Sequence, residues 1–142
     1  MHGAIFSEDE LMNNPQAQRR VLVVEDEPII RDFVCEVLGL EGFETEACES
    51  ADQALDCLED HAERFQLLIT DVRMPGSSMD GAELTDRVLV QWPMIPVIIM
   101  SGHGMPETAR IADQVEFLPK PWTMGQLINS VEKLTAAEPA RH

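Results

Sequence analysis

Five polar residues each follow a short apolar run, and their types suit the transfer of a phosphoryl group. They are Glu25, Asp26, Asp71, Ser101 and Lys120. Carboxylates held close together repel one another, and a divalent cation removes that conflict. Carboxylate oxygens with room for water favour Mg²⁺ over Zn²⁺. A lysine and a hydroxyl in the same pocket would bind phosphoryl oxygens, and an aspartate can itself be the nucleophile that forms an aspartyl phosphate.

Each of these residues, taken alone, also has an ordinary structural interpretation. An aspartate at the end of a strand is often a turn or capping residue. Ser101 before Gly102 is also typical of a turn, and Lys120 before Pro121 is also typical of a solvated lysine. The prediction of a functional site therefore rests on all five residues together and on no single one of them.

The apolar runs that precede these residues are predicted to be strands of one mostly parallel sheet. Four runs are short and rich in apolar or β-branched residues, as in strands buried on both faces, and a fifth alternates like an outer strand. The buried strands are predicted over residues 20–26, 66–71, 96–101 and 115–120, and the outer strand over 43–49. Helix-like segments lie between them, which predicts an α/β protein with helices on both faces of the sheet. Sites in such sheets lie beyond the carboxyl ends of the strands, where the five residues occur.

The ends of the helices carry recognisable signals. Pro28 suits the first turn of one helix and Gly42 its end. Three later helices are predicted to begin with the capping pairs Ser50–Gln53, Asp80–Glu83 and Thr123–Gln126. In the first helix six apolar residues have helical spacing and are expected to form its core-facing stripe: Ile29, Ile30, Phe33, Val34, Val37 and Leu38.

Composition limits the classes of partner. The 142 residues include 26 acids and 10 bases, for a formal net charge of −16, which repels phosphate backbones and anionic lipid. We therefore expect no direct binding of nucleic acid or membrane, and no apolar stretch approaches the roughly 18 residues that span a bilayer. The three cysteines, Cys35, Cys48 and Cys57, lack C-x-x-C spacing and are interpreted as small core residues in a reducing compartment rather than as a redox centre. The expected location is cytoplasmic.

The chain is expected to contain one folded domain. Residues 1–18 are predicted to be a flexible N-terminal extension, residues 19–136 the domain, and residues 137–142 a polar C-terminal tail.

Four stretches resemble the receiver domain of two-component response regulators. They are "VLVVEDEP", "LLITDVRMPGSSMDG", "PVIIMSGHG" and "FLPKPW", and the resemblance covers residues 19–136 with the motifs in the family's order. It implies a flavodoxin-like (βα)5 three-layer sandwich whose parallel five-stranded sheet has the order 2-1-3-4-5.

The resemblance also implies a role for each site residue. Asp71 matches the phosphorylated aspartate, with Mg²⁺ bound by Glu25, Asp26, Asp71 and the backbone carbonyl of Arg73. Ser101 matches the switch hydroxyl, Lys120 the phosphoryl-binding lysine, and Phe117 the aromatic switch residue. Arg73 and His103 occupy positions that tune the lifetime of the phosphate in the family, although a solvated arginine and a loop histidine are equally good interpretations.

Several features depart from the family pattern. The acidic pair is Glu-Asp where Asp-Asp is commoner, so Glu25 is expected to act through a water. The loop after Asp71 is longer than the shortest common form, and Phe117 lacks a phenolic hydroxyl. Lys120 follows Ser101 by only 19 positions, so the helix expected within residues 105–113 must be short or irregular. The output face that this helix would form is the feature that is least safely transferred from the family.

Trp92 and Trp122 are expected to be packing residues, and Trp122, beside Lys120, could report Mg²⁺ by its fluorescence.

These features predict a phosphorylation switch that accepts a phosphoryl group from a histidine kinase or a histidine phosphotransfer protein. No output segment follows residue 136, so the expected output is contact with another, unknown protein, and a homodimer stays open. The alternatives are a phosphate sink, a phosphorelay intermediate, or a receiver domain excised from a hybrid histidine kinase. A phosphohydrolase is disfavoured, because such enzymes need a second acid where Arg73 stands. A phosphorylation-independent binding module is disfavoured because the whole site is present. The protein is therefore not expected to be an enzyme beyond catalysing its own phosphorylation and dephosphorylation.

Overall fold

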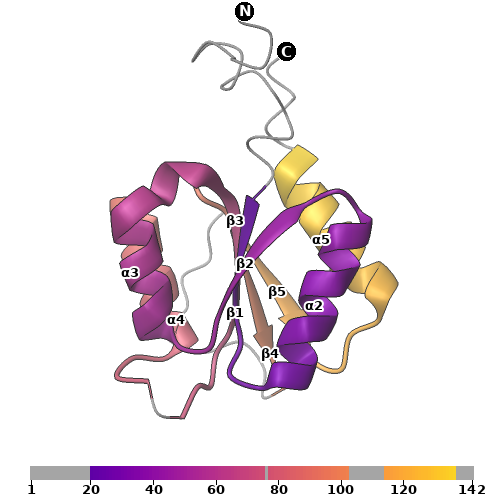
Figure 1. Ribbon diagram of the computed structural model, residues 1–142, viewed down its shortest axis with the longest axis horizontal. Coiled ribbons are helices and arrows are strands. Elements are labelled where there is room, and N and C mark those ends of the chain that lie inside the picture. The colour runs from indigo at the N-terminus through magenta and orange to yellow at the C-terminus, as the bar shows by residue number, and fades with distance from the viewer. Residues whose placement is uncertain (1–19, 76, 103–113, 137–142) are drawn as a thin grey trace, which may run out of the picture.

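The computed structural model describes residues 20–75, 77–102 and 114–136, and within them the chain forms a five-stranded parallel sheet (Figure 1). The strands are β1 (Arg20–Val24), β2 (Glu44–Cys48), β3 (Phe65–Asp71), β4 (Val97–Ser101) and β5 (Val115–Pro119). Their order in the sheet is β2-β1-β3-β4-β5. This order confirms the predicted flavodoxin-like architecture, with β2 at one edge as its alternating pattern indicated. The expectation that residues 115–120 form a strand buried on both faces was wrong, because β5 is the other edge strand and is mostly half-buried.

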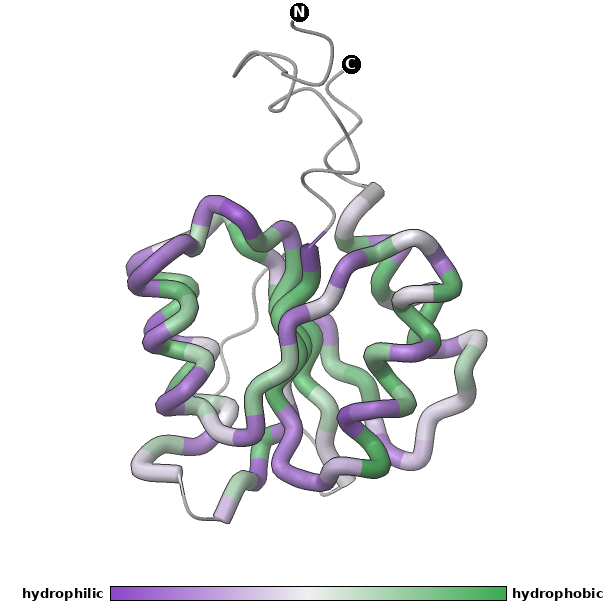
Figure 2. Tube along the Cα trace, viewed as in Figure 1, coloured by the Kyte–Doolittle hydropathy of each residue, from purple (hydrophilic) through white to green (hydrophobic). Residues whose placement is uncertain are grey.

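Helices cover both faces of the sheet. The described residues contain α2 (Pro28–Leu40), α3 (Ala51–His61), α4 (Gly81–Gln91), α5 (Met124–Ala136) and a short 3-10 turn, η2 (Ala62–Arg64). Helices α2 and α5 pack on one face, and α3 and α4 on the other (Figure 1). Strands of predominantly apolar residues lie between these two helical layers (Figure 2).

The central strands bury both of their faces, which explains why their sequences are continuous apolar runs. In β1, Val21 and Val23 belong to the core under α2 and α5. Leu22 and Val24, which point the opposite way, belong to the core under α3 and α4. A charged side chain is costly to bury in this environment, and the acids of these two strands lie at their carboxyl ends, Glu25 directly after β1 and Asp71 as the last residue of β3.

The predicted capping residues make the expected contacts. Ser50 Oγ accepts a hydrogen bond from the Gln53 amide at 3.1 Å, and the Asp80–Glu83 capping box of α4 is complete. Thr123 and Gln126 exchange the same pair of bonds at the start of α5. These contacts satisfy amide groups that have no partner within the helix.

One expectation about the core was wrong. Val34, Val37 and Leu38 of α2 are buried, but Ile29 is 84% exposed and Phe33 is 43% exposed. The reason is that the apolar stripe continues around the first turn of α2 and beyond the edge of the core. Phe33 stacks on Trp122 instead, with ring centroids 6.0 Å apart.

Three expectations lie outside the described residues. They are the N-terminal extension over residues 1–18, the tail over residues 137–142 and the short helix within residues 105–113. No helix in the described ranges is both long enough and apolar enough to cross a membrane.

Candidate functional site: three carboxylates and a lysine at the strand ends

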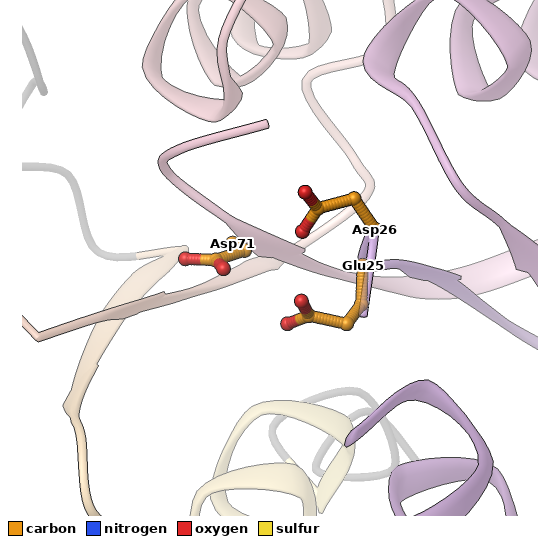
Figure 3. Close-up of side chains that lie close together, drawn as sticks. All are labelled: Glu25, Asp26 and Asp71. Carbon is orange, nitrogen blue, oxygen red and sulfur yellow. The ribbon is translucent and has the colours of Figure 1, made fainter. Parts of the chain in front are cut away.

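Three carboxylates meet where β1 and β3 end (Figure 3). Glu25 and Asp26 follow β1 directly, and Asp71 is the last residue of β3. Because Val24 pairs with Thr70 in the adjacent strand, the residues that follow emerge side by side. One ligand oxygen from each residue lies within 4.8 Å of the others. The structure therefore brings together the three acids that were predicted as a metal site.

Glu25 is fully buried. Its Oε2 accepts a hydrogen bond from the Glu27 amide at 3.1 Å, whereas its buried Oε1 has no hydrogen-bond partner. Burial raises the pKa of Glu25 to about 7, and the negative charge of Asp71 adds to that increase. A buried carboxylate oxygen with no hydrogen bond, beside two further acids, is an arrangement that a divalent cation would stabilise.

Lys120 provides the positive charge of the site. Its Nζ donates a hydrogen bond to Asp71 Oδ2 at 2.9 Å and lies 3.6 Å from Glu25 Oε1. Burial alone would lower the pKa of Lys120, but the hydrogen bond to Asp71 and the charges of Asp71 and Glu25 outweigh it and raise the pKa above its ordinary value. The ammonium group is therefore charged at neutral pH.

Asp71 is held in a defined orientation although it remains 8% exposed. Its Oδ1 accepts a hydrogen bond from the Val72 amide at 2.7 Å, and its Oδ2 accepts the bond from Lys120. The backbone carbonyl of Asp71 accepts a bond from Thr70 Oγ1 at 2.9 Å. Both carboxylate oxygens are thus oriented by donors, which is the arrangement needed by a positioned nucleophile.

Of the other predicted site residues, Ser101 and Arg73 lie near the same strand ends, whereas Phe117 lies in the middle of β5. Ser101 ends β4 and is buried, and its carbonyl accepts a hydrogen bond from the Lys120 amide at 2.8 Å. Phe117 lies in β5 opposite Ile99 and is half-buried. Arg73 is exposed two residues after Asp71. His103 lies outside the described residues.

Arg31 contributes to the site and was not predicted from the sequence. Its guanidinium donates a hydrogen bond from α2 to the backbone carbonyl of Glu25 at 2.8 Å. This bond supports the segment that carries both Glu25 and Asp26. No sequence signal distinguished Arg31 from an exposed helix arginine.

A second unpredicted feature holds the loop after Asp71, of which residues 72–75 and 77–80 are described. Asp52 in the first turn of α3 accepts two hydrogen bonds from Ser78, one from its amide at 3.0 Å and one from its hydroxyl at 2.6 Å. Ser77 Oγ accepts a bond from the Ala51 amide at 3.1 Å. The two bonds from Ser78 lower the pKa of the Asp52 carboxyl. We name this set of contacts between Asp52 and Ser78 the loop clamp.

The two ends of the same loop are also held together. The Gly81 amide donates to the Val72 carbonyl at 2.8 Å. A Cβ atom at position 81 would lie only 1.9 Å from the carbonyl oxygen of Asp71. Glycine is therefore required at this position by the close approach of α4 to the end of β3.

The chemistry of the acidic cluster fits Mg²⁺. Three carboxylates supply hard oxygen ligands, and the described residues around them provide no thiolate or imidazole that would favour a softer metal. Glu25, Asp26 and Asp71 would hold the ion, with the carbonyl of Arg73 as a further ligand.

Comparison with known proteins identifies the family. The family model described as "Response regulator receiver domain" matches residues 21–132. The nitrogen assimilation regulatory protein NtrX of Azorhizobium caulinodans is 36% identical over 116 residues, which are 80% of this chain and 25% of NtrX. The crystal structure of the receiver domain of NtrX from Brucella abortus has a TM-score of 0.72 and 39% identity, covering 82% of this chain and 98% of that one. The receiver domain of the hybrid histidine kinase CckA has a TM-score of 0.70 and 32% identity, covering 82% of this chain and 98% of that one.

The chain belongs to the response regulator receiver domains of two-component signal transduction. Domains of this family bind Mg²⁺ at an acidic pocket and interact with histidine kinases or phosphotransfer proteins. The chain spans 25% of the length of NtrX. The activity of the whole NtrX protein is therefore not assigned to this chain.

Proposed function

We propose that the protein is a phosphorylation switch that accepts a phosphoryl group on Asp71. The observation that carries this proposal is the hydrogen bond from Lys120 to Asp71 Oδ2 within a cluster of three carboxylates. One group in this arrangement can attack phosphorus, one can neutralise the transferred charge, and two can hold the cation that the reaction requires.

The donor in this proposal is the phosphohistidine of a histidine kinase or of a histidine phosphotransfer protein. An Asp71 carboxylate oxygen attacks phosphorus, the new O–P bond forms as the P–N bond to the donor imidazole breaks, and the imidazole keeps the electron pair of that bond. Lys120 stabilises the negative charge of the transferred group. Mg²⁺, when bound, would supply electrostatic stabilisation of the phosphoryl oxygens, and Glu25, Asp26, Asp71 and the carbonyl of Arg73 would hold it in place.

The output of the switch is a change at a surface that another protein recognises. Ser101 ends β4 beside the site, and Phe117 follows on the adjacent strand β5. A hydroxyl that moves toward the phosphoryl group, together with burial of the half-exposed Phe117 ring, would shift a pre-existing equilibrium between two forms. Arg73 and His103 would tune how long the phosphoryl group persists.

An alternative role uses the same chemistry. The similarity to the receiver domain of the hybrid histidine kinase CckA favours a phosphorelay intermediate, a phosphate sink or a hybrid-kinase receiver as the second candidate. Transfer of the phosphoryl group from Asp71 to a second histidine protein would identify a relay, whereas a complex formed only after phosphorylation would identify an adaptor.

Two classes of function are disfavoured. A phosphohydrolase acting on small substrates needs an acid two residues after the nucleophile, and that position holds the exposed Arg73. The proposal is therefore of a protein that catalyses only its own phosphorylation and dephosphorylation. Direct binding of nucleic acid or membrane is disfavoured by the net charge of −16, and a cytoplasmic location fits a partner of histidine kinases.

The test is phosphorylation by a small-molecule donor such as acetyl phosphate with Mg²⁺, followed by intact mass spectrometry. We expect one phosphoryl group on the wild-type protein and none on Asp71→Asn. Asp32→Asn, which changes an exposed acid on α2, is the matched control and keeps the modification. Phosphorylation that survives in Asp71→Asn overturns the proposal. Co-purification with and without beryllofluoride then identifies the partner and shows whether the protein dimerises.

A further inference from the structure

Two of the three cysteines, which belong to different secondary-structure elements, lie in contact. Cys48 is the last residue of β2 and Cys57 lies in the middle of α3, and their Sγ atoms are 3.9 Å apart. Cys48 is 4% exposed, and Cys57 is half-buried. Cys35 belongs to the core on the opposite face of the sheet, so it is a separate thiol.

We propose that Cys48 and Cys57 form a redox-modification site at which a hydroperoxide closes a reversible disulfide. The accessible Cys57 sulfur attacks the peroxide, which gives a sulfenic acid and releases water or an alcohol. Cys48 then attacks the Cys57 sulfur, forming the S–S bond and releasing water. The two thiols lose two electrons and the peroxide gains them.

The geometry around the pair suits this chemistry. The sulfurs are already in contact, so they must approach by only about 2 Å to reach the disulfide length of about 2.05 Å. The backbones they would join are connected by a short turn, because β2 ends at Cys48 and α3 begins at Ala51. The proposal requires side-chain rotations at Cys48 and Cys57 that bring the two sulfurs together.

Glu46 gives the pair a nearby acceptor for the thiol proton. Cys57 Sγ donates a hydrogen bond to Glu46 Oε2 at 3.3 Å, so the proton can leave in that direction as sulfur attacks. Burial raises the pKa of Cys57, and the hydrogen bond to Glu46 raises it further. Burial and the neighbouring thiol raise the pKa of Cys48 to about 12. The reduced pair is therefore protonated near neutral pH, and its oxidation is expected to be slower than that of an exposed, acidic thiol.

The pair is connected to the phosphorylation site from both sides. The Cys48 carbonyl accepts a hydrogen bond from the Glu25 amide at 3.0 Å. The helix that carries Cys57 also carries Asp52, whose bonds to Ser78 form the loop clamp. A disulfide would join these two supports, so oxidation changes how Asp71 is phosphorylated. This consequence rests on the proposed function, whereas disulfide formation does not.

The first test is oxidation of the full chain by hydrogen peroxide, with peptide mapping by mass spectrometry. We expect a Cys48–Cys57 linked peptide in the wild type and in the control Cys35→Ser, its loss in Cys57→Ser, and its reversal by dithiothreitol. We expect Cys57→Ser to keep the fold because position 57 is half-buried, whereas the buried position 48 is more sensitive to substitution. Absence of the linked peptide, or sulfinic acid on Cys57 without a link, overturns the proposal.

The second test compares the reduced and oxidised forms of Cys35→Ser for the rate of phosphorylation by acetyl phosphate. We expect a change of at least about twofold that dithiothreitol reverses. Equal phosphorylation rates in the two forms would show that the disulfide does not affect the phosphorylation site. They would not contradict the formation of the disulfide itself, which the first test measures. Failure of the reduced protein to become phosphorylated counts against the proposed function, so the two failures are distinguishable.

Discussion

The ammonium group of Lys120 donates a hydrogen bond to Asp71, at 2.9 Å from Nζ to Oδ2. The same ammonium lies 3.6 Å from Glu25 Oε1. One positive charge therefore lies between the proposed nucleophile and a proposed ligand of Mg²⁺, and it contributes to phosphoryl transfer while it repels the metal.

Replacing Lys120 separates these two effects. We expect Lys120→Met to slow phosphorylation of Asp71 by at least about tenfold, because a preorganised charge that stabilises the transferred group is lost. We expect the same variant to bind Mg²⁺ more tightly, because the competing cation is gone. Rates measured with acetyl phosphate and affinities measured by titration check both effects. Lys133→Met, which removes an exposed lysine paired with Glu116, is the control, and weaker Mg²⁺ binding in Lys120→Met contradicts this account.

The raised pKa of Glu25 predicts a dependence of stability on pH. The folded protein holds the Glu25 proton more tightly than the unfolded chain, since its pKa is about 7 rather than 4.5. This contribution to the free energy of unfolding is complete below pH 4.5 and is lost as the pH rises through 7. The loss is on the order of 3 kcal/mol.

Chemical denaturation of the wild type and of Glu25→Gln between pH 4.5 and 8 measures that contribution as the difference between the two proteins. We expect saturating Mg²⁺ to reverse the trend in the wild type, because the ion binds the deprotonated carboxylate. Parallel pH profiles for the two proteins without Mg²⁺ would show that Glu25 has an ordinary pKa.

The loop clamp predicts an effect of a residue outside the site. We expect Asp52→Ala to accelerate amide hydrogen exchange at Ser78 and to weaken Mg²⁺ binding, because the loop that carries the Arg73 carbonyl loses two hydrogen bonds. Exchange measured by NMR and Mg²⁺ titration are the readouts. Asp56→Ala, on the exposed side of the same helix, should leave both unchanged. If amide hydrogen exchange at Ser78 is unchanged in Asp52→Ala, the loop clamp does not hold this loop in place.

Two glycines in helices should respond to alanine in opposite directions. Gly81→Ala places a methyl group 1.9 Å from the Asp71 carbonyl oxygen, so we expect a loss of about 2 kcal/mol or more of unfolding free energy and impaired phosphorylation. At Gly39 in α2 an added methyl meets nothing within 4 Å, so Gly39→Ala should stabilise by about 0.4–1 kcal/mol. Denaturant melts of both variants measure these changes, and similar stability of the two would refute the steric argument.

Trp122 should report binding at the site by its fluorescence. It stacks on Phe33 and follows Lys120 by two residues, whereas Trp92 lies against the core under α3 and α4. We expect Mg²⁺ to change the emission of Trp92→Phe in a saturable way and to leave that of Trp122→Phe constant. A response carried by Trp92 would contradict this prediction.

The sequence predicted the sheet and the acids at its edge because both depend on the order of residues along single strands. An apolar run that is buried on both faces must end where its first charged residue stands, and parallel strands end at the same edge. That rule alone predicts that Glu25, Asp26 and Asp71 lie together at the carboxyl ends of their strands.

The contacts that the sequence did not reveal join residues of different structural elements. Arg31, the bonds between Asp52 and Ser78, and the contact of Cys48 with Cys57 each depend on how a helix lies against a strand end. Residue type and spacing carry no signal for such placements. The exposure of Ile29 has the same origin, because helical spacing gives the direction of an apolar stripe but not the extent of the core that covers it.

The hydrogen bond between the Gly81 amide and the Val72 carbonyl closes the base of the loop that follows the nucleophile. Residues between these two positions can change in number or type without shifting Asp71, because the ends of the segment are fixed independently of its middle. Evolution can therefore alter which donors and water molecules reach the phosphoryl group while the reaction itself stays the same. The position of the nucleophile and the composition of the loop beside it can therefore vary independently of each other.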